Sequence, residues 1–454
     1  MKTTLRPNII LINCDDLGYG DLGCYGSTRN RTPHLDRLAS EGTRFTDFYM
    51  ASPVCSPSRG AMLTGCYPPR IGFDRFGDQH VLFPGHRFGL SNRETTFASL
   101  LQDAGYATAL VGKWHCGDQP PFLPTRHGFD RYFGLPYSND MGRQVGRRAN
   151  MPPLPLLDND TVAEQQPDMS ALTERYVAEA RRFITAHRDQ PFLLYLAHMY
   201  VHLPLIVPER FLKRSENGRY GAAVAVIDWA MGALLHTLEQ LGLDDNTLIL
   251  FTSDNGSRIN GEGGSNGPLR GTKRETYEGG MRLPLIARWP GHVPAGRTCD
   301  TLCSAIDFLP TFANLAGADS PDLPIDGVDF TPTLLGDDDH QPRPHFAYFR
   351  QHQLQAVRDN RYKLRLAHGG AFENPAVCEL YALHDDIGET TDIANQHPDI
   401  VQRLQRVADQ YEEELGPEGT ARRPSGRVDN AQPLTTFDEN YPYFAAEYDL
   451  GDAG

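Results

Sequence analysis

Short apolar runs alternate with amphipathic stretches over most of the chain. Four runs rich in branched aliphatic residues are predicted to be buried strands: residues 8–12, 106–111, 192–196 and 247–252. Two stretches with apolar residues on helical spacing are predicted to be helices: residues 96–104 and 220–241. Alternating strand and helix units predict an α/β fold, in which helices flank a large, mixed, mostly parallel sheet.

The pattern changes near residue 336, where an acidic and proline-rich segment begins. Short strand-like pieces follow, and an amphipathic helix then begins near Pro398 and stops at Gly416. A chain of 454 residues also exceeds the roughly 250–300 residues at which one core stops growing. We therefore expect an α/β domain at residues 1–340. Residues 341–454 should form a C-terminal subdomain with a small antiparallel sheet, one helix and an irregular tail.

Two segments suit the selection of a ligand. Residues 140–166 are rich in Pro, Arg and Asn and lack periodicity, which predicts a long surface excursion. Residues 70–87 contain three charged or titratable side chains close together in the sequence: Arg75, Asp78 and His80. Because binding residues are often carried on loops, we expect selectivity to lie in these two segments.

The formal net charge of −15 argues against nucleic acid or an anionic membrane as a principal partner. No run of 18 apolar residues is present, so we expect no membrane span. The residues after Met1 lack the apolar segment of a signal peptide. The protein is thus expected in the cytoplasm if Met1 is the native start, or exported if a signal peptide is missing. Eight scattered cysteines predict buried free thiols, and nothing in the sequence indicates an oligomeric state.

Polar clusters follow the predicted strands. Asp15–Asp16 follow the first strand, Lys113 and His115 the second, His202 the third, and Asp254–Asn255 the fourth. Ligands of open α/β sheets bind at the carboxyl ends of the strands, so these clusters are expected to share one site. The Asp15–Asp16 and Asp254–Asn255 pairs offer oxygen ligands only, which suits Ca²⁺ or Mg²⁺ and disfavours Zn²⁺.

A short motif adds a thiol, a proline and a guanidinium: Cys55-Ser56-Pro57-Ser58-Arg59. At this motif the chain resembles the formylglycine-dependent sulfatases of the alkaline phosphatase superfamily, and arylsulfatases in particular. The resemblance extends over most of the chain, including residues 15–21, 44–49, 58–65, 135–140, 276–282 and 379–386. It implies a sulfuric ester hydrolase that cleaves an aryl or carbohydrate sulfate monoester. It also implies a formylglycine-generating enzyme that oxidises Cys55 to formylglycine, and it favours Ca²⁺, with Mg²⁺ as the alternative.

The resemblance further implies a role for each candidate side chain. The metal ligands would be Asp15, Asp16, Cys55, Asp254 and Asn255. The catalytic groups would be Cys55, Arg59, Lys113, His115, His202 and Lys273. Ser138 would bind the sulfate together with Lys113, His202 and Lys273. We expect His202 to protonate the leaving oxygen and His115 to take the hemiacetal proton, and these two roles are interchangeable at this stage.

Two other functions compete with this interpretation. A phosphate diester or phosphonate monoester hydrolase of the same superfamily can share the formylglycine, although such relatives tend to carry a histidine where this chain has Asn255. A non-catalytic binder of sulfated glycans would be expected to have lost ligands or the cysteine, and every expected group is present. Aryl sulfates, sulfated sugars and sulfolipid headgroups all remain open as substrates.

Overall fold

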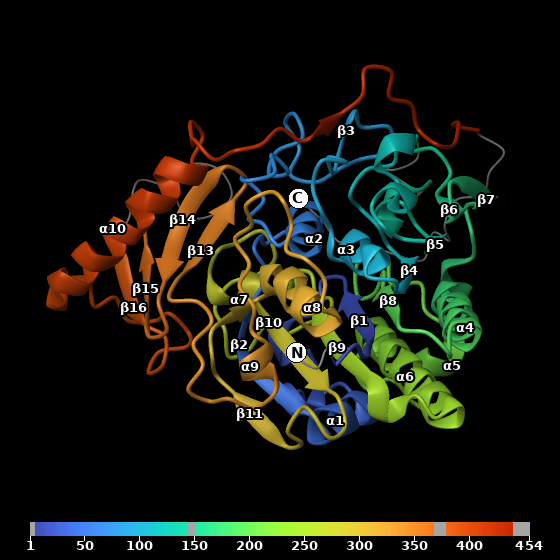
Figure 1. The fold of residues 1–454 in the computed structure, drawn as a ribbon, viewed down its shortest axis with the longest axis horizontal. Helices are drawn as coiled ribbons and strands as arrows, with labels where there is room; N and C mark the ends of the chain where they lie inside the picture. Colours follow the sequence, from blue (N-terminus) through green and yellow to red (C-terminus); the bar gives the residue numbers. More distant parts are fainter. Residues whose placement is uncertain (1–4, 144–149, 367–377, 439–454) are drawn as a thin grey trace.

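The computed structural model describes residues 5–143, 150–366 and 378–438. Within these residues the main sheet has eleven strands, and the sheet runs through the centre of the molecule (Figure 1). Its order is β11 (Arg297–Cys299), β2 (Thr43–Tyr49), β10 (Arg282–Arg288), β9 (Thr247–Ser253), β1 (Asn8–Cys14), β8 (Phe192–Ala197), β4 (Ala107–Gly112), β5 (Arg131–Gly134), β6 (Pro155–Asp158) and β7 (Thr161–Gln165), while β12 (Cys303–Ser304) also pairs with β2.

The central strands β9, β1, β8, β4 and β5 are parallel to one another, while β10 pairs antiparallel with β9, β6 pairs antiparallel with β5, and β7 pairs antiparallel with β6. The predicted α/β class with a mixed, mostly parallel sheet is therefore confirmed. All four predicted strands are present in β1, β4, β8 and β9, and each is a continuous buried run because both faces of the sheet are covered.

Alternate residues of β1 pack into two different cores. Ile10 and Ile12 join one core with helices α1 (Pro33–Ser40), α4 (Met169–Ala186) and α6 (Gly218–Leu241). Ile9 and Leu11 join the other core with α2 (Cys55–Thr64), α3 (Phe97–Asp103) and α8 (Phe308–Ala316). This alternation follows from the two-residue period of a strand, and it makes the fold a three-layer sandwich.

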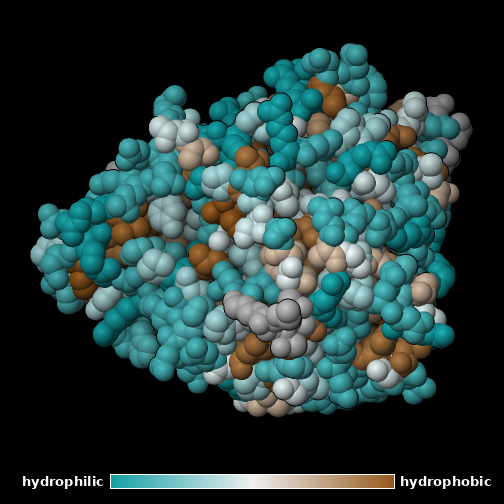
Figure 2. All heavy atoms as spheres, in the orientation of Figure 1, coloured by the Kyte–Doolittle hydropathy of each residue, from teal (hydrophilic) through white to brown (hydrophobic). Residues whose placement is uncertain are grey.

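Helix α6 is long and apolar enough to cross a membrane by length and composition, but 72% of its most apolar window is buried inside the protein. It packs against α1, α4 and the short helix α5 (Glu209–Leu212), so it is accounted for as a core helix. The face drawn in Figure 2 is mostly hydrophilic with scattered apolar spots.

A second sheet follows in the C-terminal part, with the antiparallel order β13 (Phe346–Arg350), β14 (Gln353–Arg358), β15 (Tyr362–Arg365) and β16 (Glu379–Ala382). Helix α10 (Pro398–Leu415) packs against β14 and β15. The predicted small antiparallel sheet with one helix is confirmed as part of the fold, and the helix begins and ends where the sequence indicates. The boundary between residues 340 and 341 stays a prediction. The helix α9 (Thr331–Leu334) precedes it.

A buried ionic cluster joins the two sheets. Lys363 of β15 contacts Glu278 at 2.9 Å and Glu389 at 2.8 Å, and it donates to the carbonyl oxygen of Thr276 at 2.8 Å. Glu278 is the first residue of α7 (Glu278–Met281), which leads directly into β10 of the main sheet. Burying these charges is tolerable only because each one has an opposite partner.

The tail beyond α10 runs back over the α/β part of the chain, along the top of Figure 1. There β17 (Gly426–Arg427) pairs with β3 (Phe88–Gly89), and Arg423 forms an ion pair with Glu94 at 2.7 Å. The described part of the predicted tail is thus irregular apart from one short strand.

The predicted surface excursion at residues 140–166 contains regular structure in its second half. There β6 and β7 form a hairpin at the edge of the main sheet, and Asn159 in the turn has a left-handed φ of 52°. Asn tolerates the left-handed conformation better than most residues, which suits it to this tight turn. Residues 144–149 lie outside the described part of the chain.

Candidate active site

Four parallel strands end at nearly the same level of the sheet. Cys14 of β1 is paired with Ser253 of β9, and Gly112 of β4 is paired with Ala197 of β8. The residues that follow therefore emerge side by side. Gly112 has a φ of +115°, and a Cβ on it would lie 1.9 Å from the carbonyl oxygen of Ala197. Only glycine allows β4 to turn here and deliver Lys113 to the common edge.

The acidic pairs meet at this edge, as a prediction based on strand ends requires. The backbone N–H of Asp16 donates to Asp254 Oδ1 at 3.3 Å, and Asn255 Nδ2 donates to Asp16 Oδ1 at 2.7 Å. All four side chains, Asp15, Asp16, Asp254 and Asn255, are buried.

Three oxygen atoms of this cluster have no hydrogen-bond partner among the described residues: Asp15 Oδ1, Asp16 Oδ2 and Asn255 Oδ1. Buried polar atoms are normally paired, so orphaned carboxylate and amide oxygens at one point need a cation or a donor. Asp15, Asp16 and His202 offer ligand atoms within 4.8 Å of one another, and so do Asp15, Cys55 and Asp254. The donor set therefore fits a divalent metal ion.

Basic side chains surround the acidic cluster. Lys113 Nζ donates to Asp15 Oδ2, and Lys273 Nζ donates to Asp16 Oδ1 at 2.6 Å. Arg59 binds Asp254 Oδ2 through Nε at 2.9 Å and through Nη2 at 2.8 Å. These three cations are themselves buried, which gives the site a dense and nearly balanced set of charges.

The carboxyl pKa values differ across the cluster. Burial by itself would raise the pKa of Asp15, but Lys113, His202 and Arg59 hold it well below its usual range. Burial and the neighbouring Asp15 carboxylate raise the pKa of Asp254 to about 6. Like charges at close range produce this divergence, and a bound cation would relieve it.

Cys55 is the first residue of α2, and its side chain is 2% exposed. The motif opens a helix over residues 55–64, an element that was not predicted from the sequence. Pro57 fits because the first turn of a helix leaves its N–H groups without partners. Cys55 and Arg59 are four residues apart, so the helix presents both on one face. Burial raises the pKa of the Cys55 thiol, although Lys113 and Lys273 oppose that shift.

His115, His202 and Ser138 complete the set of side chains around the acidic cluster. His115 Nε2 contacts the carbonyl oxygen of Leu82 at 3.0 Å, which assigns the proton to Nε2 and leaves the unpartnered Nδ1 as an acceptor. His202 Nδ1 contacts the carbonyl oxygen of Leu203 at 2.6 Å, and its Nε2 lies 3.9 Å from Asp16 Oδ2. Ser138 Oγ accepts from Lys113 Nζ at 3.3 Å.

A cavity of about 120 Å³ reaches these side chains from outside. Cys55, His115, Ser138, His202 and Lys273 line it, so the structure brings the sequence-predicted side chains to one place. Gln79, Val81, Phe83, Asp140 and Met141 also line the cavity and belong to the two segments expected to select the ligand, whereas the lining residues Val54 and Arg274 lie outside those segments and were not predicted. His80 also lines the cavity. Arg75 and Asp78, named with it in the sequence, are not among the lining residues and face each other at 3.8 Å on the exposed surface.

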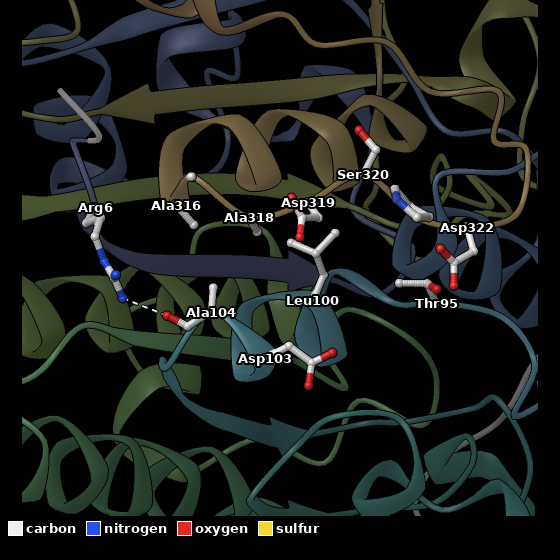
Figure 3. A pocket seen from close by; sticks show the side chains of 12 residues that line it. Arg6, Thr95, Leu100, Asp103, Ala104, Ala316, Ala318, Asp319, Ser320 and Asp322 are labelled. Atoms are coloured by element: carbon white, nitrogen blue, oxygen red, sulfur yellow. Dashed lines mark hydrogen bonds between the residues drawn. The ribbon is translucent and has the colours of Figure 1, made fainter. Parts of the chain in front are cut away.

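A larger cavity of about 360 Å³ lies elsewhere (Figure 3). Arg6, which precedes β1, donates from Nη2 to the carbonyl oxygen of Ala104 there, so this cavity is at the opposite end of the strands. It is lined by Asp103, Asp319 and Asp322 and by the C-terminal ends of α3 and α8. Both features disfavour an anionic ligand.

The chain is similar to known proteins over most of its length. The Sulfatase family model matches residues 7–318, and the model of the N-sulphoglucosamine sulphohydrolase C-terminal region matches residues 271–414. Human arylsulfatase A is 39% identical over 446 residues, with 88% of this chain and 87% of that protein covered. Rat N-acetylgalactosamine-6-sulfatase is 42% identical over 381 residues, covering 79% and 71%. A crystal structure of a sulfatase from Pseudoalteromonas sp. superimposes with a TM-score of 0.81 at 28% identity, covering 91% of each chain.

The fold and the site define a hydrolase of the alkaline phosphatase-like type with a buried polar centre at its strand ends. The chain belongs to the sulfatase family, and its activity is the hydrolysis of sulfate esters.

Proposed function

We propose that the protein hydrolyses sulfate monoesters at the edge of the sheet where β1, β4, β8 and β9 end, with position 55 as the site of the nucleophile. The observation that supports this most directly is the place of Cys55. Its thiol and the carboxylates of Asp15 and Asp254 offer ligand atoms within 4.8 Å of one another, at the end of a cavity that also reaches Lys273 and His202.

An unmodified thiol suits this role poorly. Its raised pKa keeps it protonated at neutral pH, and the thiolate is the form that attacks. We infer that a formylglycine-generating enzyme converts Cys55 to formylglycine. The hydrated aldehyde supplies a hydroxyl nucleophile, and re-formation of the carbonyl lets sulfate depart without an attacking water.

The proposed metal ligands are Asp15, Asp16, Asp254 and Asn255, with position 55 as a further ligand. Oxygen donors favour a hard cation, so we propose Ca²⁺, with Mg²⁺ as the alternative. The bound ion supplies charge that lowers the pKa of a hydroxyl and offsets negative charge on the sulfate.

The basic side chains would hold the sulfate in place. Lys113 and Ser138 are already in contact, at 3.3 Å, and Lys273 lines the same cavity. Fixed donors in a water-poor site stabilise charge that develops in the transition state without needing to reorganise. Arg59 donates to Asp254 and to the carbonyl oxygen of Lys113, each at 2.9 Å. We therefore propose that Arg59 holds the side chain of residue 55 in its orientation.

The hydrogen bonds of the two histidines support separate roles. His115 carries an unpartnered Nδ1 and a pKa lowered by burial and by Lys113, which suits a proton acceptor. Burial and Lys273 lower the pKa of His202, while Asp16, Asp15 and Asp140 oppose that shift. Because this lowered pKa favours the neutral ring, the assignment of His202 as the group that protonates the leaving oxygen rests on its place in the cavity and not on its pKa.

The test combines mass with turnover. Peptide analysis of active protein is expected to show residue 55 about 18 Da lighter than cysteine, the difference between a thiol and an aldehyde. Turnover of 4-nitrophenyl sulfate should rise with the modified fraction, and Cys55→Ala should have none. Full turnover with an unmodified thiol would remove residue 55 from the mechanism. Faster cleavage of an aryl phosphate diester than of the aryl sulfate would favour the phosphohydrolase alternative.

A further inference from the structure

The side chain of Asn266 joins two segments of the chain that carry residues of the active site. Asn266 is 2% exposed and is not among the residues that line the active-site cavity. Its Oδ1 accepts the N–H of Ser257 at 2.8 Å, and its Nδ2 donates to the carbonyl oxygens of Ser257 at 2.8 Å and Gly271 at 3.0 Å. Ser257 comes two residues after Asn255. Gly271 comes two residues before Lys273, so one amide fixes the backbone beside both of these site residues.

The two segments are also bonded to each other, and they converge on one carboxylate. The N–H of Lys273 donates to the carbonyl oxygen of Ser257 at 3.2 Å, the same oxygen that Asn266 Nδ2 binds. Lys273 Nζ donates to Asp16 Oδ1 at 2.6 Å, and Asn255 Nδ2 donates to that same atom at 2.7 Å. A shift of the backbone at Ser257 would therefore move both side chains that contact Asp16 Oδ1.

Asn266 and its neighbour Ser265 also contact the segment that follows the first acidic pair. The N–H of Gly20 donates to the carbonyl oxygen of Ser265 at 2.9 Å, and the N–H of Ser265 donates to Asp21 Oδ1 at 2.9 Å. A Cβ on Gly18 would lie 2.2 Å from the carbonyl oxygen of Ser265 and 2.5 Å from Asn266 Oδ1. Only a residue without a side chain allows this close approach, so all three segments that meet at the acidic cluster are in contact with residues 265–266.

The hydrogen bonds around residue 266 call for a primary amide. One backbone N–H needs an acceptor at this point, and the carbonyl oxygens of Ser257 and Gly271 both accept from the same side chain. An amide supplies one acceptor and two donors from a single planar group, whereas a carboxylate supplies acceptors only. Buried backbone groups without a partner are unfavourable, so a side chain without these donors would let the backbone at Ser257 and Gly271 shift.

We propose that Asn266 is a positioning residue of the active site, which holds Asn255 and Lys273 in their places on either side of Asp16. This inference rests on the proposed function, in which Asp16 and Asn255 bind the metal ion and Lys273 binds the sulfate. Asn266 acts through the backbone of Ser257 and Gly271, and through them on both binding groups at once. Replacing a residue that supports metal ligands typically weakens metal binding or activity by about 10–100-fold.

Two variants of Asn266 and one control test the proposal. Asn266→Ala removes all three side-chain hydrogen bonds, and Asn266→Asp keeps the shape and the bond from the Ser257 N–H but offers no donor. The control is Thr108→Val, which removes buried hydrogen bonds at the start of β4, the end of that strand remote from the site. There Thr108 Oγ1 donates to the carbonyl oxygen of Gly128 at 2.7 Å and accepts the N–H of Asp130 at 3.0 Å.

Metal binding and turnover are measured separately on each protein. Calorimetry with chelator-treated protein gives the Kd and the stoichiometry for Ca²⁺, and it is repeated with Mg²⁺. Turnover of 4-nitrophenyl sulfate by the formylglycine form gives kcat and KM. Partial unfolding lowers the stoichiometry and the apparent kcat but leaves Kd and KM unchanged, because the folded fraction still binds normally. A displaced ligand or sulfate-binding group changes Kd and KM themselves.

Both Asn266 variants are expected to raise the Kd for the metal ion about ten-fold or more and to raise KM as well, whereas Thr108→Val should keep the Kd and KM of the unaltered protein. Unchanged Kd and KM in Asn266→Asp, or equal increases in Thr108→Val, would overturn the proposal. If the unaltered protein binds neither Ca²⁺ nor Mg²⁺, the proposed metal site is wrong. KM, which reports on Lys273, then decides the role of Asn266 by itself.

Discussion

Replacing Lys363 by methionine tests whether the buried ionic cluster holds the C-terminal sheet in place. The ammonium of Lys363 is fully buried and lies 2.9 Å from Glu278 and 2.8 Å from Glu389. It also stands 4.1 Å from the centre of the Tyr348 ring. Methionine fills a similar volume but leaves the two carboxylates facing each other. Removing one partner of a buried ion pair costs about 3–5 kcal/mol, because the remaining charge is uncompensated.

The loss of stability in Lys363→Met should depend on pH, and the direction of this dependence follows from the pKa of Glu389. Burial already raises the pKa of this carboxyl above its ordinary value of 4.5, although Lys363 opposes the shift. Without Lys363 the folded-state pKa rises further, so the folded variant binds a proton that the unfolded chain releases. Stability then falls as pH rises above about 4.5, by about 1.4 kcal/mol for each unit by which the pKa increases. The variant should be less impaired at pH 5 than at pH 8.

Urea unfolding of both proteins at pH 5 and pH 8 measures this difference. Lys213→Met is the control, because Lys213 pairs with Glu209 at 2.7 Å on the surface and such pairs contribute at most about 1 kcal/mol. A loss of unfolding free energy in Lys363→Met that is no larger than in Lys213→Met, or that is the same at both pH values, would refute this explanation.

The same substitution should also affect the active site. The carbonyl oxygen of Gly280, in the helix that Glu278 begins, accepts the N–H of Gly256 at 3.1 Å. Gly256 directly follows Asn255, so displacement of this helix moves one proposed metal ligand. We therefore expect slower turnover of 4-nitrophenyl sulfate in protein that is still folded.

Two further predictions concern the metal and acid stability. Asp254→Ala should lose turnover, and it should also lose the rise in melting temperature that Ca²⁺ gives to chelator-treated protein. The control is Asp228→Asn, because Asp228 is a buried carboxylate that accepts from the N–H groups of His34 and Leu35 at 2.9 Å; this variant should keep the Ca²⁺ response despite lower stability. An unchanged Ca²⁺ response in Asp254→Ala would refute the ligand assignment. Burial lowers the pKa of His127 from 6.5 to about 4, so the unfolded chain takes up a proton first, and stability is lost as pH falls through this window, by up to about 3 kcal/mol. His127→Phe should reduce the stability difference between pH 7 and pH 4, and urea unfolding that shows the same difference in both proteins would contradict this.

The strand ends were the most predictable part of the site. Asp15 and Asp254 follow long apolar runs, and parallel strands bring their carboxyl ends to one edge whatever the intervening loops do. The helix at Cys55 was not predicted, because a proline in the third position reads as a turn unless the start of the helix is already known. Arg274 was missed for a related reason. Its place at the cavity mouth depends on one left-handed backbone angle, which no periodic pattern in the sequence records.

The burial of α2 has a consequence for the order of events during biosynthesis. Residues 55–64 are all enclosed in the finished molecule, with the side chain of Cys55 only 2% exposed. A second enzyme cannot close around this segment once the helix has packed beneath the sheet edge. The proposed oxidation of the thiol would therefore have to precede packing, so that maturation and folding would compete in time. Chains that fold too quickly would be trapped with an inert cysteine and an otherwise complete catalytic centre.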